Sequence, residues 1–225
     1  MRVVLAGGHG QIALRLERLL ADRGDVAVGL VRDPLQVQDL RAAGAEAVVC
    51  DLERTTAAQL AGHLQGADAV VFAAGAGPGS APGRKESVDR DGAVLLAEAA
   101  VLAGVRRYLL VSSMGAGAAP PPGTDEVFAG YLAAKTAAEE ALRTHDDLDW
   151  TVLRPGALTD DPGTGLVELA PSVARGSVPR DDVAAVLAAL LDAPWSHGAV
   201  LELVAGATPV QAASGPASLE APKTR

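Results

Sequence analysis

Cysteine and aromatic residues are scarce in this chain, and the shortage narrows the possible structures. Cys50 is the only cysteine among 225 residues, so no internal disulfide can form, and a reducing, cytoplasmic environment is expected. Aromatic residues make up only 3% of the chain, whereas Ala, Val and Leu dominate. This composition suits a parallel sheet covered by alanine-rich helices.

The chain also lacks excess positive charge, long apolar runs and clustered metal ligands. Its formal net charge of −9 argues against a nucleic-acid partner or an anionic membrane surface. No apolar run is long enough to span a membrane, and the first one breaks into glycines too early for a signal peptide. The four histidines are scattered, so no metal site is expected. We therefore expect a small-molecule ligand, no nucleic acid and no membrane, with the chain a monomer or a homodimer.

Strand and helix patterns alternate along residues 1–205. Short apolar runs predict strands at 3–5, 25–31, 47–50, 69–72 and 108–111, with a sixth before Arg154. Helical spacing predicts helices between them, at 12–20, 34–43, 85–103 and 131–143. The alternation is typical of a single α/β domain of Rossmann type, in which a doubly wound parallel sheet carries helices on both faces.

The rest of the chain has a weaker pattern. A short segment near 156–180 is left to build a substrate pocket, and an amphipathic helix is expected over 180–191. A last strand is expected over 200–204, at the sheet edge, and residues 206–225 are expected to be disordered or loosely docked. Two loops of small residues are expected near the site: 77–83 as a mobile loop, and 115–123 as a lid or an idle surface insertion.

The first thirteen residues carry the clearest binding motif. An apolar strand runs directly into Gly7, Gly8 and Gly10, and the helix that follows directs its unpaired N–H groups above the strand end. In this G-x-x-G-x-x-A pattern, Gly7 permits a tight turn and Gly10 lets the backbone approach a pyrophosphate. No Lys-Ser or Lys-Thr follows, which excludes a mononucleotide P-loop. The pattern indicates a dinucleotide site, and a glycine-rich turn without a ligand is the alternative.

Residues at the ends of the next strands indicate which dinucleotide binds. Arg32 ends the second strand, where an arginine suits the 2′-phosphate of NADP and an acidic residue would bind the ribose of NAD. We therefore favour NADP(H) over NAD(H); in the alternative, Arg32 is solvated and Asp33 only caps a helix. Asp51 follows the third strand, where it either meets the adenine amino group or caps the next helix. The small residues 73–75 follow the fourth strand, where a flat ligand can lie close to the backbone.

Tyr131 and Lys135 are the residues most suited to proton transfer. They lie four residues apart in a predicted helix, hence one above the other on the same face. A nearby ammonium favours the phenolate form of a tyrosine, and a serine hydroxyl can steady a carbonyl oxygen. Ser112 and Ser113 end the preceding strand. Such a Tyr–Lys pair also arises by chance on exposed helices, so its position after this strand matters more than its spacing.

Taken in this order, the motifs resemble the short-chain dehydrogenase/reductase superfamily, and within it the atypical branch of small NmrA-like and NAD-dependent epimerase-like proteins. The similarity extends over nearly all of residues 1–205. The matching residues are Gly7, Gly8, His9, Gly10, Gln11, Ile12, Ala13, Arg32, Asp51, Leu52, Ala73, Ala74, Gly75, Val111, Ser112, Ser113, Tyr131, Lys135, Arg154, Pro155, Gly156, Ala157 and Leu158.

The resemblance implies a role for several of these residues. Tyr131 would be the catalytic acid/base, and Lys135 would bind the nicotinamide ribose and lower the pKa of the tyrosine. Ser113 would orient the substrate, with Ser112 as the alternative serine and as a cofactor contact. Residues 155–158 would pack on the nicotinamide side of the cofactor, and the remaining matches would bind its other parts.

These observations predict an NADPH-dependent reductase acting on a small carbonyl or planar substrate. Three alternatives stay open. In the first, the chain is a redox sensor that binds NADP(H) without turnover. In the second, it is an epimerase that holds NAD tightly and acts on a sugar nucleotide, and in the third it is a flavin- or biliverdin-type reductase that needs no tyrosine. The substrate segment is shorter than that of the sugar epimerases that the chain resembles.

Overall fold

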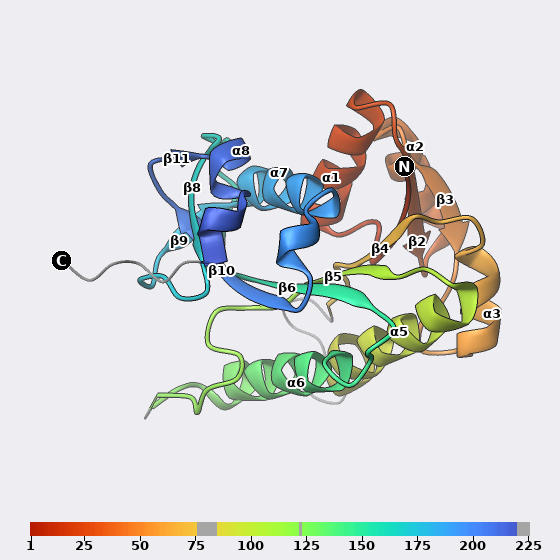
Figure 1. Cartoon of the computed structure of the whole chain (residues 1–225). Helices are drawn as coiled ribbons and strands as arrows, with labels where there is room; N and C mark the ends of the chain where they lie inside the picture. The colour runs from red at the N-terminus through yellow and green to blue at the C-terminus, as the bar shows by residue number, and fades with distance from the viewer. Residues whose placement is uncertain (76–84, 122, 220–225) are drawn as a thin grey trace.

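The computed structural model describes residues 1–75, 85–121 and 123–219, and the predicted loop at 77–83 lies outside them. Within these residues the chain forms a nine-stranded sheet with helices on both faces (Figure 1). The predicted doubly wound α/β fold is confirmed. None of the described helices has both the length and the apolar character that a membrane crossing requires.

The sheet is parallel over most of its width. Its order is β11-β8-β10-β6-β5-β4-β1-β2-β3, and β8 runs antiparallel to both of its neighbours, β10 and β11. The strands are β1 (Arg2–Ala6), β2 (Val26–Val31), β3 (Glu46–Val49), β4 (Ala69–Phe72), β5 (Arg107–Val111), β6 (Asp149–Pro155), β8 (Leu166–Ala170), β10 (Ala199–Ala205) and β11 (Thr208–Pro209). Val3 of the inner strand β1 pairs with Ala27 on one side and Ala69 on the other. Every strand from β1 to β6 therefore ends at the same edge of the sheet.

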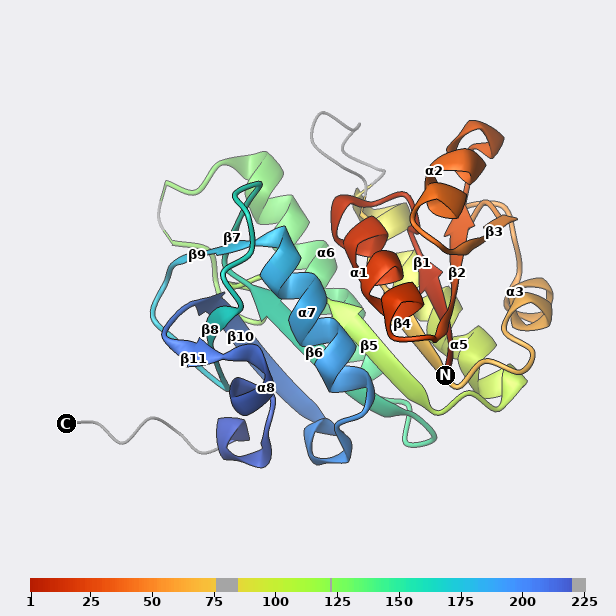
Figure 2. The same ribbon diagram turned by 90° about the horizontal axis from the view of Figure 1, so that it is seen from above.

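Two helical layers bury the faces of the sheet. One layer holds α1 (Gln11–Asp22), α2 (Val37–Ala42) and α7 (Arg180–Leu191), and Figure 2 shows α1 and α7 side by side over the strands. The other holds α3 (Ala57–His63), α5 (Gly92–Ala103) and α6 (Glu126–Leu142). Each layer has its own apolar core, because side chains alternate between the two faces along every strand. Shorter turns are η1 (Pro34–Gln36), η2 (Lys85–Asp91), η3 (Pro194–Ser196), α8 (Val210–Ala213) and η4 (Pro216–Leu219).

The second half of the chain departs from the prediction in three places. The strand predicted at the sheet edge is β10, which instead lies inside the sheet between β6 and β8. The segment near 156–180 contains β8 and a separate two-stranded parallel sheet of β7 (Ala157–Thr159) and β9 (Ser177–Pro179). After residue 206 the chain continues as β11, α8 and η4, with Val210 and Ala213 buried, so this part packs on the domain.

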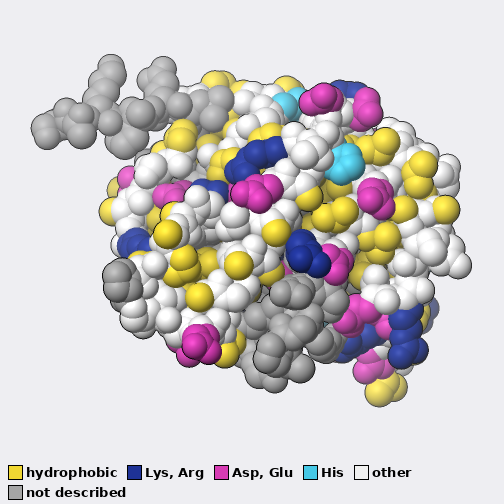
Figure 3. All heavy atoms as spheres, turned by 90° about the horizontal axis from the view of Figure 1, so that it is seen from below, with side chains coloured by type: hydrophobic (Ala, Val, Ile, Leu, Met, Phe, Trp, Pro, Cys, Tyr) yellow, Lys and Arg dark blue, Asp and Glu magenta, His cyan; other side chains and the backbone are white. Residues whose placement is uncertain are grey.

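The face formed by α5 and α6 exposes apolar side chains between separated charged ones (Figure 3). Leu102 of α5 and Val127 of α6 are 62% and 58% exposed. This layer otherwise packs inward through alanines, which lets the helices lie close to the sheet.

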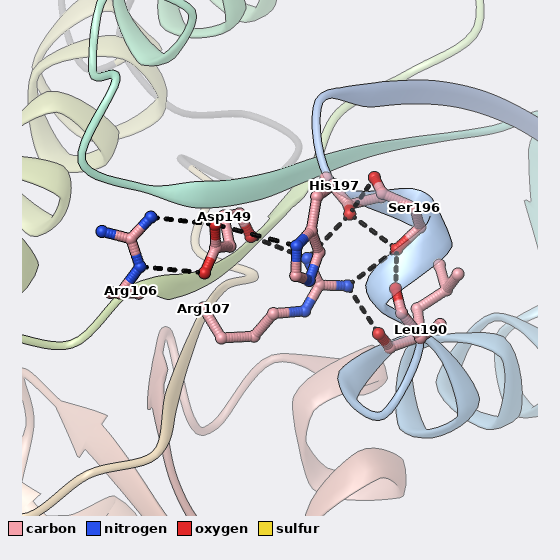
Figure 4. A network of polar contacts seen from close by, with 8 residues as sticks. Arg106, Arg107, Asp149, Leu190, Ser196 and His197 are labelled. Atoms are coloured by element: carbon pink, nitrogen blue, oxygen red, sulfur yellow. Dashed lines mark hydrogen bonds and ion pairs between the residues drawn. The ribbon is translucent and has the colours of Figure 1, made fainter.

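A buried arginine holds together the amino end of the sheet, opposite the edge where the strands finish. Arg107 of β5 donates hydrogen bonds to Asp149 O (2.7 Å), Thr151 Oγ1 (2.9 Å), Leu190 O (2.5 Å) and Ser196 Oγ (2.9 Å). Figure 4 shows its guanidinium reaching the last turn of α7. Burial lowers the pKa of Arg107 to about 10. The arginine thus links two strands to the end of a helix.

Candidate functional site

The glycine loop between β1 and α1 has the close backbone contacts that its sequence predicts. Gly7 has φ +82°, and a Cβ atom there would lie 2.5 Å from Ala74 Cα at the end of β4. A Cβ on Gly8 would lie 2.7 Å from Gly29 Cα of β2. Only glycine fits at either place. Gly10 precedes α1 and has no side chain to cap the first N–H groups of this helix, which are left for a ligand.

A cavity of about 680 Å³ opens at the carboxyl ends of the strands, above the glycine loop. Most of the predicted site residues line it, namely Gly7, His9, Gly10, Gln11, Ile12, Arg32, Asp51, Leu52, Ala73, Ala74, Gly75, Ser112, Tyr131, Lys135 and Leu158. The predicted residues outside its lining are Gly8, Ser113, Pro155, Gly156 and Ala157. The lining also includes residues that the sequence did not single out, of which Glu53, Asp89 and Arg180 are charged.

Arg32 and Glu53 face each other at the β2 end of the cavity. Arg32 Nη1 lies 3.4 Å from Glu53 Oε2, and the arginine side chain is 55% exposed. Asp33 accepts a hydrogen bond from Leu35 N (2.9 Å), so it caps the turn η1, as its alternative reading predicted. Asp51 Oδ1 accepts one from Glu53 N (3.1 Å), which ties the two loop residues together. Arg32 is thus an exposed cation in the cavity wall, and the Glu53 carboxylate contacts it only at the long end of hydrogen-bonding distance.

Tyr131 and Lys135 come from the same face of α6 and both line the cavity. Lys135 Nζ lies 5.7 Å from the centre of the Tyr131 ring. The ammonium donates a hydrogen bond to Val111 O (3.1 Å) at the end of β5, and only 4% of the side chain is exposed. The strand end therefore fixes the lysine beside the tyrosine.

Asp89 is the functional candidate that the sequence analysis missed. Its Oδ1 lies 3.1 Å from Lys135 Nζ, and the aspartate side chain is 1% exposed. It sits in η2, a π-helical turn that leads into α5, and such turns occur frequently at functional sites. A carboxylate on the otherwise apolar inner face of this predicted helix, three residues before Gly92, was the available signal.

The two serines differ in their surroundings. Ser112 Oγ donates to Glu139 Oε1 (2.5 Å) and lines the cavity, whereas Ser113 Oγ lies 3.4 Å from Met114 O outside it. Glu139 is fully buried and also accepts two hydrogen bonds from Arg154, at 2.9 and 2.6 Å. This network fixes the Ser112 hydroxyl, and of the two serines it is Ser112 that lines the cavity.

A buried carboxyl lies beneath the glycine loop. Glu17 of α1 is fully buried, and a Cβ on Gly8 would lie only 3.0 Å from its Oε1. Neither carboxyl oxygen has a hydrogen-bond partner among the described residues. Burial raises the pKa of Glu17 to about 8. The group is therefore protonated at neutral pH and places no charge under the loop.

Comparisons with known proteins point to the same kind of site. A family model described as NAD(P)H-binding matches residues 7–194. An uncharacterised sugar epimerase of Bacillus subtilis is 37% identical over 211 residues, with 93% of this chain and 97% of the relative covered. A solved structure from Bacillus halodurans, assigned provisionally as an NAD-dependent epimerase/dehydratase, has a TM-score of 0.85 and 34% identity over 94% of this chain and 97% of that one. An oxidoreductase from Lactococcus lactis has a TM-score of 0.82 and 28% identity, with 95% of both chains covered.

Proposed function

The chain belongs to the NAD(P)H-binding family, and we propose that it is an NADPH-dependent oxidoreductase of the short-chain dehydrogenase/reductase type. Its substrate would be a small carbonyl compound or a planar molecule. The observation that carries the proposal is that one cavity is lined by the glycine loop, by Arg32 and by the Tyr131–Lys135 pair. A dinucleotide fold and a proton-transfer pair therefore share one site.

The residues present fit a dinucleotide. The close contacts of Gly7 with Ala74 and of Gly8 with Gly29 hold the loop backbone directly against the strand ends, and the uncapped start of α1 would supply N–H donors for a pyrophosphate. Arg32 would hold the 2′-phosphate, while Ala73, Ala74 and Gly75 would lie against the cofactor. The nicotinamide would supply the hydride.

The chain's own residues would handle the proton. Tyr131 would give a proton to the reduced oxygen. Ser112 has a single hydroxyl proton, which Glu139 accepts in this structure, so this proton would turn to the substrate for Ser112 to stabilise the same oxygen. Lys135 would orient the ribose from its place between Val111 O and Asp89. The Asp89 carboxylate offsets part of the lysine charge that would otherwise act on the phenol.

Cofactor preference is tested by fluorescence titration with NADPH and NADH. We expect wild type to bind NADPH at least tenfold tighter, a difference of roughly 1.4 kcal/mol. Arg32→Ala should remove this preference and leave NADH affinity unchanged. Arg54→Ala is the matched control, because Arg54 is 87% exposed nearby and pairs with Asp51, yet does not line the cavity. If neither nucleotide binds, the glycine loop has been misread and the proposal fails.

Turnover is tested with Tyr131→Phe in a screen of carbonyl and planar acceptors. Loss of the phenolic proton should lower kcat about 100-fold or more while the Kd for NADPH stays the same. Tyr108→Phe is the matched control, since Tyr108 is the other tyrosine of the chain, is buried and does not line the cavity. Equal rates for Tyr131→Phe and wild type would favour a reductase that stacks its acceptor on the nicotinamide. Cofactor binding with no turnover of any acceptor would favour the sensor.

A further inference from the structure

A second arginine lines the cavity on the other side of the glycine loop from Arg32. Arg180 is the first residue of α7, directly after β9, and β9 pairs with β7, where Leu158 also lines the cavity. Arg32 follows β2, on the opposite side of β1 in the sheet order. The proposed cofactor site accounts for Arg32 but has no role for Arg180.

The partner of Arg180 is a weak one. Arg180 Nη1 donates to Asp160 Oδ1 (2.8 Å), and in the part of the chain that the structure describes this is the only carboxylate within ion-pair distance. The Asp160 side chain is 73% exposed, so water screens the pair strongly. Arg154 shows the contrast, because it is bonded twice to a fully buried glutamate. An incoming anion can therefore share or replace the partner of Arg180 but not that of Arg154.

Aromatic surface belongs to the same cavity, because Tyr131 lines it and Phe128, which does not line it, stacks on Tyr131. The chain contains two phenylalanines and two tyrosines, and one of each forms a stacked pair on α6. The rings of Phe128 and Tyr131 have centres 5.9 Å apart and planes 26° apart. Leu158 lines the cavity and is 39% exposed, so it offers further apolar surface to a ligand. Such surfaces favour a flat, conjugated molecule.

Tyr131 and the arginine reach the cavity from opposite faces of the sheet. Tyr131 comes from α6 below the sheet in Figure 1, and Arg180 comes from α7 above it. We infer that the substrate of this site is a planar conjugated anion, with its ring system against Tyr131 and Leu158, its carboxylate or phosphate on Arg180, and Phe128 supporting the Tyr131 ring from behind. This inference rests on the proposed function and adds the class of substrate.

The test uses a matched pair of probes, 2-naphthoate and 2-naphthamide, which share a flat ring system and differ in charge. Their Kd values are measured by calorimetry on NADP⁺-loaded protein at pH 7. Naphthoate should bind at least tenfold tighter than naphthamide. Arg180→Leu should abolish that ratio, and Asp160→Asn should tighten naphthoate binding a few-fold because it removes the competing carboxylate.

Two controls separate charge from shape. Arg106→Leu removes an exposed, paired arginine at the opposite end of the sheet and should keep the tenfold ratio. Phe128→Ala should weaken both probes equally. Equal binding of the probes to wild type, or a preserved ratio in Arg180→Leu, overturns the inference. If neither probe binds although NADP⁺ does, the inference fails and the proposed cofactor site stands; if NADP⁺ itself does not bind, the proposed function fails first.

Discussion

The buried charged side chains at the two ends of the sheet have different surroundings. At the amino end, Arg107 is enclosed, and oxygens of β6, of the end of α7 and of η3 accept its hydrogen bonds. At the carboxyl end, Lys135 and Asp89 are as deeply buried, yet both line a cavity. The first arrangement connects elements of the fold, whereas the second keeps polar groups where a ligand can meet them.

The comparison shows why burial alone does not identify a site. Arg107 has a pKa lowered to about 10, a shift that could mark a functional group. Burial is the cause of the shift, and Arg107 lines neither the cavity above the glycine loop nor the second one beside α7, so the shift marks a structural residue. Lys135 is distinguished instead by its surroundings, which are the cavity and the Asp89 carboxylate. A polar group that faces both a cavity and a second ionisable group is the better functional candidate.

Arg107→Met should break the amino end and have the largest effect. It removes the charged donor from Asp149 O, Thr151 Oγ1 and Ser196 Oγ, whereas Leu190 O keeps a hydrogen bond from Ala193 N. This loss should lower the free energy of unfolding by about 3 to 4 kcal/mol. Urea unfolding measures the loss, and NADPH affinity should not change. Arg106→Met is the control: Arg106 is the adjacent residue, but it is exposed and bonded only to Asp149, so we expect no resolvable change. Equal losses in the two variants would contradict the distinction.

The carboxyl end of the sheet also holds an ionisable group, Glu17, that has no part in the proposed ligand site. Glu17→Gln tests how its ionisation affects the stability of the fold. The pKa of Glu17 is about 8 in the folded chain against its usual value of 4.5, so the folded state keeps a proton that the unfolded state loses. Wild-type stability should therefore fall as pH rises between about 5 and 8, by roughly 1.4 kcal/mol per unit, and by about 2 kcal/mol from pH 6 to 7.5.

In Glu17→Gln this fall should disappear, because the amide does not ionise. Urea unfolding at several pH values measures both proteins. Glu140→Gln, on the exposed side of α6, should keep the wild-type slope. A slope that survives in Glu17→Gln would mean that another group causes it.

The first half of the fold was predictable because its signals are local. The strand, glycine turn and helix at residues 2–22 are each marked by neighbouring residues, and the structure confirms them. The place of β10 was not predictable, because an apolar run does not show which strands lie on either side of it. β7 and β9 were missed because three residues are too few for a period to appear.

The candidate site was predictable to the same extent. Tyr131 and Lys135 share a helix, so their spacing places them together. The Asp89–Lys135 contact joins residues 46 positions apart, so although the apolar face of the predicted helix marks Asp89 as unusual, its partner appears only in the folded chain. The choice between Ser112 and Ser113 likewise depends on Glu139, which only the folded chain brings to the serine.

A helix was expected after Asp51, but the bounds of α3 were not predicted, although its first turn carried a signal. Thr56 accepts a hydrogen bond from Gln59 N (3.3 Å), and Gln59 Oε1 accepts one from Thr56 N (3.1 Å), which together form a capping box. This turn lies in the connection after β3, at the carboxyl end of the sheet, but it does not line the cavity. A change in this turn therefore tests a residue that lies at the carboxyl end of the sheet without contacting the cavity.

Thr56→Ala should have the smallest effect. Loss of the cap should lower the free energy of unfolding by about 1 kcal/mol, because one N–H at the helix start loses its acceptor. NADPH affinity should stay at the wild-type value, since neither Thr56 nor Gln59 faces the cavity. Thr56→Ser keeps the oxygen and should restore most of the stability. If Thr56→Ala lowered NADPH affinity as much as Arg32→Ala does, lining the cavity would not be what makes a residue matter for NADPH binding. Any residue at this end of the sheet could then affect it.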